Sequence, residues 1–173
     1  MTARRILLLR HAKSAWDEPG LDDYERPLAP RGRRAAAVMG VYLRDEDLVP
    51  DLVLCSGARR ARETWEIAAH ELAAAPPVEH EQALYMVSAD RLLKRLRKLP
   101  TSTNSVLVVG HEGGVDALAR RLVSDGAAPL RRRLAEKFPT AAMAVIAVAL
   151  ADWGLLAEKS CTLIRFAAPK DLV

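Results

Sequence analysis

The chain has 173 residues, of which 50% are hydrophobic and 28% charged. This length and composition predict one globular domain over residues 1–173 and exclude a disordered or fibrous protein. The two cysteines are too few for a disulfide framework, and no cysteine–histidine cluster suggests structural zinc. The net charge of +4 suits nucleic acid or a phosphorylated substrate, but genomic base bias produces the same balance, so charge alone decides nothing.

Neither a membrane helix nor a secretion signal is predicted. The longest apolar stretch, residues 141–151, is about half of the ~20 residues that a membrane helix requires. The apolar run at residues 6–9 is shorter than the ~7–15 residues at the centre of a signal peptide. We therefore expect a cytoplasmic protein that has no membrane partner.

Short apolar runs alternate with helical patterns along the chain. Unbroken Val/Ile/Leu runs predict central strands buried on both faces, here at residues 6–9, 52–54 and 106–109. Apolar residues at helical spacing predict helices within residues 35–43, 61–72, 92–99 and 115–122. The alternation predicts an α/β fold, a three-layer α/β/α sandwich with a mostly parallel central sheet.

Two later segments complete the predicted sheet, and one long connection interrupts the chain early. Residues 141–150 and 161–166 predict a hairpin-like pair of strands at one side of the sheet. Residues 11–30 form a connection that contains three prolines and a glycine. Because loops of this length in a compact domain usually have a function, we expect this one to border a site.

The residues that follow the three central strands carry the chemistry. Arg10 and His11 follow the first run, Arg60 lies shortly after the second, and His111 follows the third. Ligands of open α/β sheets bind beyond the carboxyl ends of the strands, so these side chains are expected to meet. No carboxylate cluster arrives with them, which favours an anion site over a metal site and implies no metal or other cofactor.

Each of these residues also has an ordinary structural explanation. A histidine after a strand is often a loop residue with satisfied hydrogen bonds, and an arginine there is often a surface charge. The run Arg131–Arg133 is interpreted as a solvated helix face, and His70 and His80 as surface residues. Two histidines and a pair of arginines at the same topological position are harder to explain in this way.

Motifs along nearly the whole chain resemble one family. Arg10-His11-Ala12-Lys13-Ser14, followed by Trp16, resembles the RHG-type signature of the histidine phosphatase (phosphoglycerate mutase-like) superfamily. Its Ala-Lys-Ser variant is similar to the short SixA branch, the phosphohistidine phosphatases. Further matches follow in order: Arg26-Pro27-Leu28, Arg31-Gly32, residues 56–61 with Thr64, Val109-Gly110-His111, and finally Trp153, Phe166 and Pro169. The resemblance implies a phosphoglycerate mutase-like fold.

The resemblance also implies roles for the residues at the strand ends. His11 matches the nucleophile, which attacks phosphorus and forms a phosphohistidine that water hydrolyses. Arg10 and Arg60 match the phosphate-binding arginines, whose guanidinium groups suit paired phosphate oxygens. His111 matches the second histidine of the pocket. The remaining residues that we expect to border the substrate are Lys13, Ser14, Arg59 and Gly110.

One departure from the family pattern concerns the general acid. Larger members carry an acidic residue in the segment after the second helix, where this chain has Met86. Asp90, the nearest carboxylate downstream, is better explained as a first-turn charge of a helix capped by Ser88. Asp17, Asp22 and Asp23 lie in the long connection, and the sequence does not place them relative to the site. SixA-like proteins share this lack of an evident acid, so the departure favours that branch over a mutase.

Taken together, the residues and the resemblance predict a metal-independent phosphohydrolase that acts through a phosphohistidine intermediate. The predicted substrate is phosphohistidine on a protein. One alternative is a small-molecule phosphatase of the same fold, and another is a non-catalytic module that binds phosphate or RNA. The presence of both His11 and His111 argues against the module, because arginine and lysine suffice for binding. No nucleic-acid partner is therefore expected.

Overall fold

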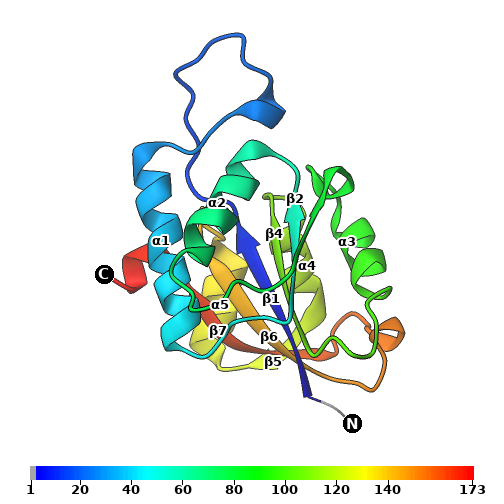
Figure 1. Ribbon diagram of the computed structural model, residues 1–173. Helices are drawn as coiled ribbons and strands as arrows, with labels where there is room; N and C mark the ends of the chain where they lie inside the picture. Colours follow the sequence, from blue (N-terminus) through cyan, green and yellow to red (C-terminus); the bar gives the residue numbers. More distant parts are fainter. Residues whose placement is uncertain (1–2) are drawn as a thin grey trace.

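The apolar runs form the centre of a seven-stranded sheet in the computed structural model, which describes residues 3–173. Strands β1 (Ala3–Arg10), β2 (Leu52–Ser56) and β4 (Ser105–Gly110) run parallel to one another (Figure 1). The order across the sheet is β3-β2-β4-β1-β6-β7-β5. The outer strand β3 (Val78–Glu81) pairs in parallel with β2.

The other half of the sheet contains the one reversed strand. β6 (Met143–Ala149) is antiparallel to both of its neighbours, β1 and β7 (Cys161–Ala167). β5 (Val123–Gly126) then pairs in parallel with β7 at the edge. The predictions of a mostly parallel sheet and of an antiparallel pair near the C-terminus are thus confirmed.

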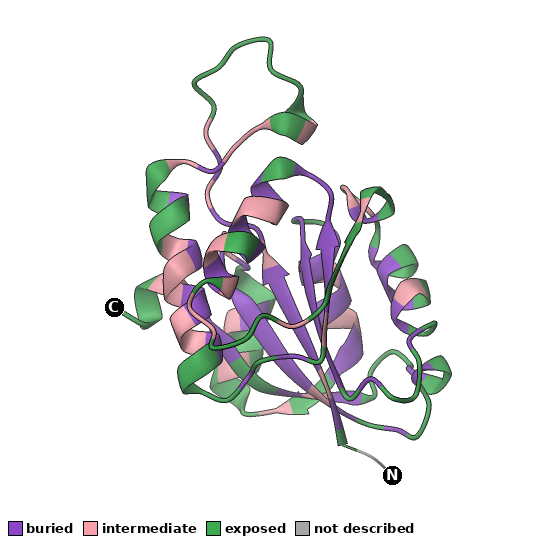
Figure 2. Ribbon diagram, in the orientation of Figure 1, coloured by how far each residue is buried: buried purple, intermediate pink, exposed green. Residues whose placement is uncertain are grey.

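Helices cover both faces of the sheet, and β1 shows why. Ile6 and Leu8 point into a core formed with α3 (Ala89–Leu96), α4 (Val115–Leu122) and α5 (Ala128–Glu136). Leu7 and Leu9 point into a second core formed with α1 (Pro30–Asp45) and α2 (Arg59–Ala69). Figure 2 shows the buried sheet between helices whose outer faces are exposed. The predicted three-layer sandwich is therefore confirmed.

Local signals in the sequence explain several element ends. Pro30 stands at the first turn of α1, where the missing N–H leaves no bond unmade. Ser88 accepts a hydrogen bond from the backbone N–H of Arg91 and caps α3, with Asp90 in its first turn, as the sequence predicts. No helix within residues 3–173 combines the length and the apolar character needed to cross a membrane.

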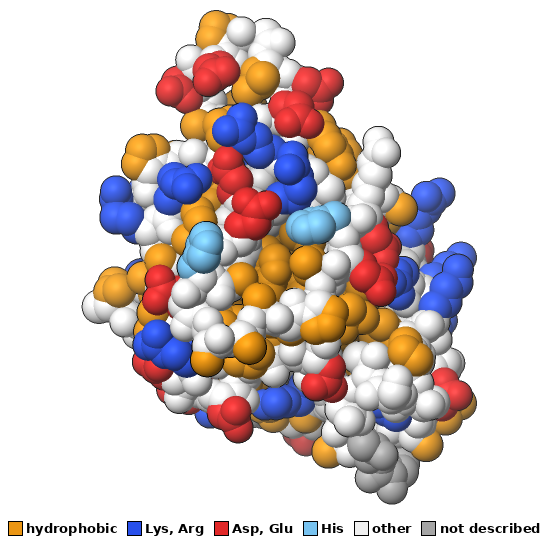
Figure 3. Space-filling model, in the orientation of Figure 1, with side chains coloured by type: hydrophobic (Ala, Val, Ile, Leu, Met, Phe, Trp, Pro, Cys, Tyr) orange, Lys and Arg blue, Asp and Glu red, His pale blue; other side chains and the backbone are white. Residues whose placement is uncertain are grey.

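Residues 15–27, here called the arm, extend away from the body of the protein (Figure 1). Its base is closed by a bridge between Ser14 and Leu28 and by a hydrogen bond from the Ala15 N–H to the Pro27 carbonyl (2.8 Å). Acidic side chains lie along the arm and basic side chains gather at its base, as Figure 3 shows. The long connection thus forms a projection beside the carboxyl ends of the central strands.

Candidate active site

The adjacent carboxyl ends of β1, β2 and β4 bring the predicted residues together. His11 directly follows β1, His111 directly follows β4, and Arg60 lies in the first turn of α2. The His11 N–H donates to the Gly110 carbonyl (2.9 Å), so the two strand ends are joined next to the histidines. The two imidazole ring centres lie 5.2 Å apart.

His11 is buried and held in one tautomer. Its Nδ1 lies 2.7 Å from the Ala12 carbonyl oxygen, and its Nε2 lies 3.3 Å from Arg60 Nε. Because the carbonyl only accepts and the guanidinium only donates, the ring proton is assigned to Nδ1 and the lone pair to Nε2. Burial, with smaller contributions from the nearby His111 and Arg60 charges, lowers the pKa of His11 to about 3. His11 is therefore neutral at pH 7.

His111 also contacts Arg60, and its pKa is lowered in the same way as that of His11. Its Nε2 lies 2.8 Å from Ser56 Oγ, and its Nδ1 lies 3.5 Å from Arg60 Nη2. Burial first, and the Arg60 charge second, lower the pKa of His111 to about 4. The free site therefore holds two neutral histidines, and an anion bound between them would raise both pKa values.

Arg60 is 2% exposed and connects the parts of the site. Its guanidinium contacts both histidines and lies 5.7 Å from the centre of the Tyr85 ring. Thr64 fixes the helix turn that carries it, because Thr64 Oγ1 donates to the Arg60 carbonyl (2.6 Å) and accepts from the Ala12 N–H (3.0 Å). The turn that presents Arg60 is thereby tied to the segment that presents His11.

Arg10 has a donor that is left without a partner. Its Nη1 donates to the Phe138 carbonyl (2.9 Å), and its Nη2 lies 3.3 Å from Glu112 Oε2. Its Nε is buried and has no hydrogen-bond partner among residues 3–173. Leaving a buried donor unpaired costs ~1–3 kcal/mol, more when it is charged. This geometry suits a bound anion, which would complete the hydrogen bonds of Arg10.

The arm supplies an anion from within the chain, at Asp23. Its carboxylate lies 3.0 Å from Arg60 and 3.0 Å from Arg26, and the Tyr85 hydroxyl donates to it. The Tyr85 bond, followed by the bonds and charges of the two arginines, holds the pKa of Asp23 well below its usual range. Asp23 is thus an ionised carboxylate against the guanidinium that the sequence assigns to phosphate.

Two predicted residues, Gly110 and Ser14, form hydrogen bonds with residues of the site. Gly110 accepts the backbone bond of His11, and Ser14 is buried and accepts a hydrogen bond from Arg26. The Arg26 guanidinium lies 3.6 Å from the centre of the exposed Trp16 ring. The sequence signalled Arg26 only through its family motif, and it gave no signal for Tyr85.

Two other predicted residues lie apart from the histidines. Arg59 is exposed and pairs with Glu63 (2.9 Å), one helical turn along α2. The Lys13 side chain lines a separate hollow with Arg31 and Lys137. The structure places both residues outside the cluster of the two histidines, and their contact with substrate stays a prediction.

Asp90 and Met86, the two residues discussed above in connection with a general acid, lie in different places. Asp90 pairs with Arg121 (2.8 Å) on the α3–α4 side of the sheet, so it does not contact the site. Met86 does reach the site, with its Sδ 3.9 Å from Arg60 Nη2. The position where larger family members carry an acid is therefore next to Arg60 and apolar in this chain.

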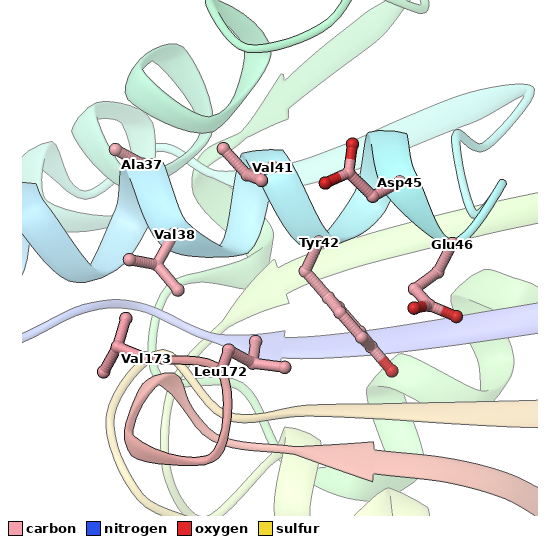
Figure 4. Close-up of a pocket in the computed structure, with 8 residues that line it drawn as sticks. All are labelled: Ala37, Val38, Val41, Tyr42, Asp45, Glu46, Leu172 and Val173. Atoms are coloured by element: carbon pink, nitrogen blue, oxygen red, sulfur yellow. The ribbon is translucent and has the colours of Figure 1, made fainter.

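Other features of the surface do not offer this chemistry. A hollow of about 420 Å³ between α1 and the C-terminal segment has no histidine or arginine in its lining (Figure 4). Its residues are Ala37, Val38, Val41, Tyr42, Asp45, Glu46, Leu172 and Val173. Over residues 3–173, no group of three or more His, Cys, Asp or Glu side chains is arranged to hold a metal ion.

Comparison with known proteins identifies the family of the chain. The model of the histidine phosphatase superfamily (branch 1) matches residues 6–86. The uncharacterized protein Rv1276c of Mycobacterium tuberculosis is 38% identical over 164 residues, which cover 94% of this chain and 100% of that protein. SixA of Nakamurella multipartitia superposes with a TM-score of 0.84 at 29% identity and 98% coverage of both chains. SixA of Agrobacterium tumefaciens gives 0.81 and 28%, covering 96% of this chain and 98% of its own. These neighbours support a phosphatase, and the chain belongs to the histidine phosphatase superfamily, in its SixA-type branch.

Proposed function

We propose that this protein hydrolyses phosphohistidine on another protein, by way of a phosphohistidine formed on its own His11. One observation carries the proposal. The neutral His11 presents its Nε2 lone pair beside Arg60, while Asp23, the carboxylate nearest to Arg60, is held ionised and so has no proton to give. The site combines a nucleophile and cations with no evident general acid. The SixA neighbours carry the name of phosphohistidine phosphatases, which supports the same substrate.

In the first step His11 Nε2 attacks phosphorus and the P–N bond of the substrate breaks. The electron pair of that bond stays on the ring nitrogen of the substrate. A proton on the other ring nitrogen lets this imidazole leave neutral, so no enzyme acid is needed. Arg10 and Arg60 neutralise the phosphoryl oxygens as charge shifts during transfer.

In the second step water attacks the phosphoryl group on His11. The Nε2–P bond breaks, its electron pair returns to Nε2, and the proton of the water leaves with the phosphate. The Ala12 carbonyl keeps the proton on Nδ1 throughout (2.7 Å), so the phosphorylated ring is a cation and a good leaving group. His111, once an anion has raised its pKa, donates to the same oxygens.

No metal ion or other cofactor takes part in this scheme, because the two arginines supply the positive charge. Turnover should therefore persist in a chelator, and vanadate should inhibit by binding as a five-coordinate phosphoryl mimic. Loss of turnover in chelator that a divalent ion restores would contradict this part of the proposal.

The leaving group provides the main test. General acid catalysis contributes ~10²–10⁴-fold when an alkoxide must leave, and this site has none to offer. Specificity constants should therefore be at least ~10²-fold higher for phosphohistidine and other phosphoramidates than for alkyl esters such as phosphoglycerate. Activated aryl esters should fall between. Introducing an acid by Met86→Glu should raise turnover of alkyl esters more than turnover of aryl esters or phosphoramidates. Equal constants for phosphoramidate and alkyl ester would contradict the proposal and point to Asp23 or Glu112 as an acid.

The intermediate provides a second test. Radiolabelled substrate should leave a label on the protein that survives alkali and is lost in acid, the behaviour of an N-phosphoryl group. His11→Asn should remove both label and turnover, whereas His70→Asn, which changes an exposed histidine, should change neither. A His11→Asn protein with full turnover would rule out the nucleophile.

A further inference from the structure

A basic hollow of about 440 Å³ lies beside the active site, and we call it the basic groove. Its charged lining consists of Lys13, Arg31, Lys137 and Lys170, and no Asp or Glu takes part in it. A smaller hollow shares Lys137 and Lys170 with it, so the concave surface continues toward Arg133 and Glu136. Four basic residues from four different segments of the chain therefore line one concavity.

The four cations are not bound to carboxylates within the part of the chain that the structure describes, where no salt bridge involves any of them. Asp171 lies next to Lys170 in sequence, but its carboxylate is bound to Arg133 and to the Ala168 N–H. The positive charges repel one another, and an anionic ligand would relieve that repulsion.

The groove is separate from the cluster of histidines but is connected to it through neighbouring backbone. Lys13 lies two residues after His11, and Arg10 donates to the Phe138 carbonyl, next to Lys137. The Ala141 N–H donates to the carbonyls of both Arg10 and His11 (3.1 Å each). The N-terminus of α1, which has no side-chain cap, begins one residue before Arg31 and adds positive potential. A substrate bound at His11 therefore lies next to the groove.

The chemistry of the groove favours carboxylates on a protein. Lysine and arginine both pair with Asp and Glu carboxylates, so the three lysines and one arginine of the lining complement an acidic protein segment. The lining contains no aromatic side chain, and single-stranded nucleic acid binds chiefly by stacking on such rings. We propose that the basic groove binds an acidic segment of the protein whose phosphohistidine enters the active site. This inference rests on the proposed function and specifies its substrate class.

Turnover of phosphohistidine peptides with acidic or neutral flanks tests the groove. The acidic peptide should have the higher kcat/KM, by about tenfold at low salt, and the advantage should shrink as salt rises. Lys137→Glu/Lys170→Glu should abolish the preference and leave turnover of a small phosphoramidate unchanged, because both side chains are exposed and outside the catalytic machinery. Lys94→Glu/Lys98→Glu, which reverses two exposed lysines in and just after α3 that do not line the groove, should keep the preference.

The outcomes separate the groove from the proposed function. Turnover of both peptides with equal kcat/KM, or a preference that survives the Lys137/Lys170 double variant, overturns the groove and leaves the catalytic proposal intact. Absence of turnover with every phosphohistidine substrate overturns the proposed function, and the inference falls with it. Self-association lost in the double variant, or RNA binding tighter than binding of the acidic peptide, would assign the groove to another partner and overturn it.

Discussion

At the scale of single residues, the electrostatics of the site centre on Arg60. A buried guanidinium between two imidazoles helps to keep both rings neutral, which preserves the lone pair of His11. The same group faces the Asp23 carboxylate. Arg60 therefore adds to burial in keeping the nucleophile neutral, and in the free protein it binds the Asp23 carboxylate.

The Asp23 carboxylate should compete with phosphate in the free protein. Asp23→Asn removes that charge, so phosphate and vanadate should inhibit at concentrations about 2–10-fold lower, the effect of a partly exposed ion pair. Inhibition constants measured against an aryl phosphate provide the readout. Asp17→Asn, an exposed residue of the same arm, is the control. Unchanged inhibition constants together with a strongly reduced kcat would instead identify Asp23 as a proton donor.

At the scale of elements, the burial of a strand determines whether its sequence pattern predicts it. β1 and β4 are apolar on both faces because helix layers cover both, so unbroken apolar runs predict them. β3 reads Val-Glu-His-Glu at an exposed edge, and only Val123 is buried in β5. These two edge strands have no apolar pattern to predict them, and their pairing with neighbouring strands defines them.

The site likewise contains residues that the sequence could group and residues that only the folded structure brings together. His11, His111 and Arg60 could be grouped from the sequence because adjacent parallel strands end at one edge of the sheet. Asp23 and Tyr85 come from loops, and only the folded path of the arm brings them to Arg60. For Arg59, the Glu63 one turn along the helix was an available signal that it pairs locally.

The contact between α1 and α2 depends on the absence of a side chain at Gly40. A Cβ there would lie 2.3 Å from the Ala68 carbonyl oxygen of α2. Gly40→Ala should therefore push the helices apart and lower the free energy of unfolding by roughly 1–2 kcal/mol, since overpacking outweighs the gain in helix propensity. Urea denaturation measures this, with Arg34→Ala on the exposed face of α1 as control. A stable Gly40→Ala protein would show that the helix spacing adjusts.

At the scale of the whole molecule, the buried histidines couple stability to pH. Their folded pKa values of about 3 and about 4 lie below the ~6.5 of an unfolded histidine. Between the folded and the unfolded pKa values, the unfolded chain binds more protons than the folded chain. The free energy of unfolding therefore falls as the pH drops below about 6.5. The two histidines together should cost about 2 kcal/mol between pH 6 and pH 5.

Urea midpoints at the two pH values provide the measurement. His11→Gln/His111→Gln should lose less stability on acidification than the unmodified protein, because no buried imidazole remains to be protonated on unfolding. His70→Gln/His80→Gln, which changes two exposed histidines, should keep the unmodified pH dependence. Equal slopes for all three proteins would mean that His11 and His111 titrate normally.

The reversed strand β6 is also separated from its partner β1 by most of the chain. β1 emerges from the ribosome before the other strands of the sheet, yet β6, which pairs with it from Ala3 to Leu9, is among the last strands to follow. Until then one edge of an apolar strand stays open to pairing with other chains. A nascent chain halted before Met143 already carries His11, Arg60 and His111, but the strand that holds His11 has only one of its two neighbours.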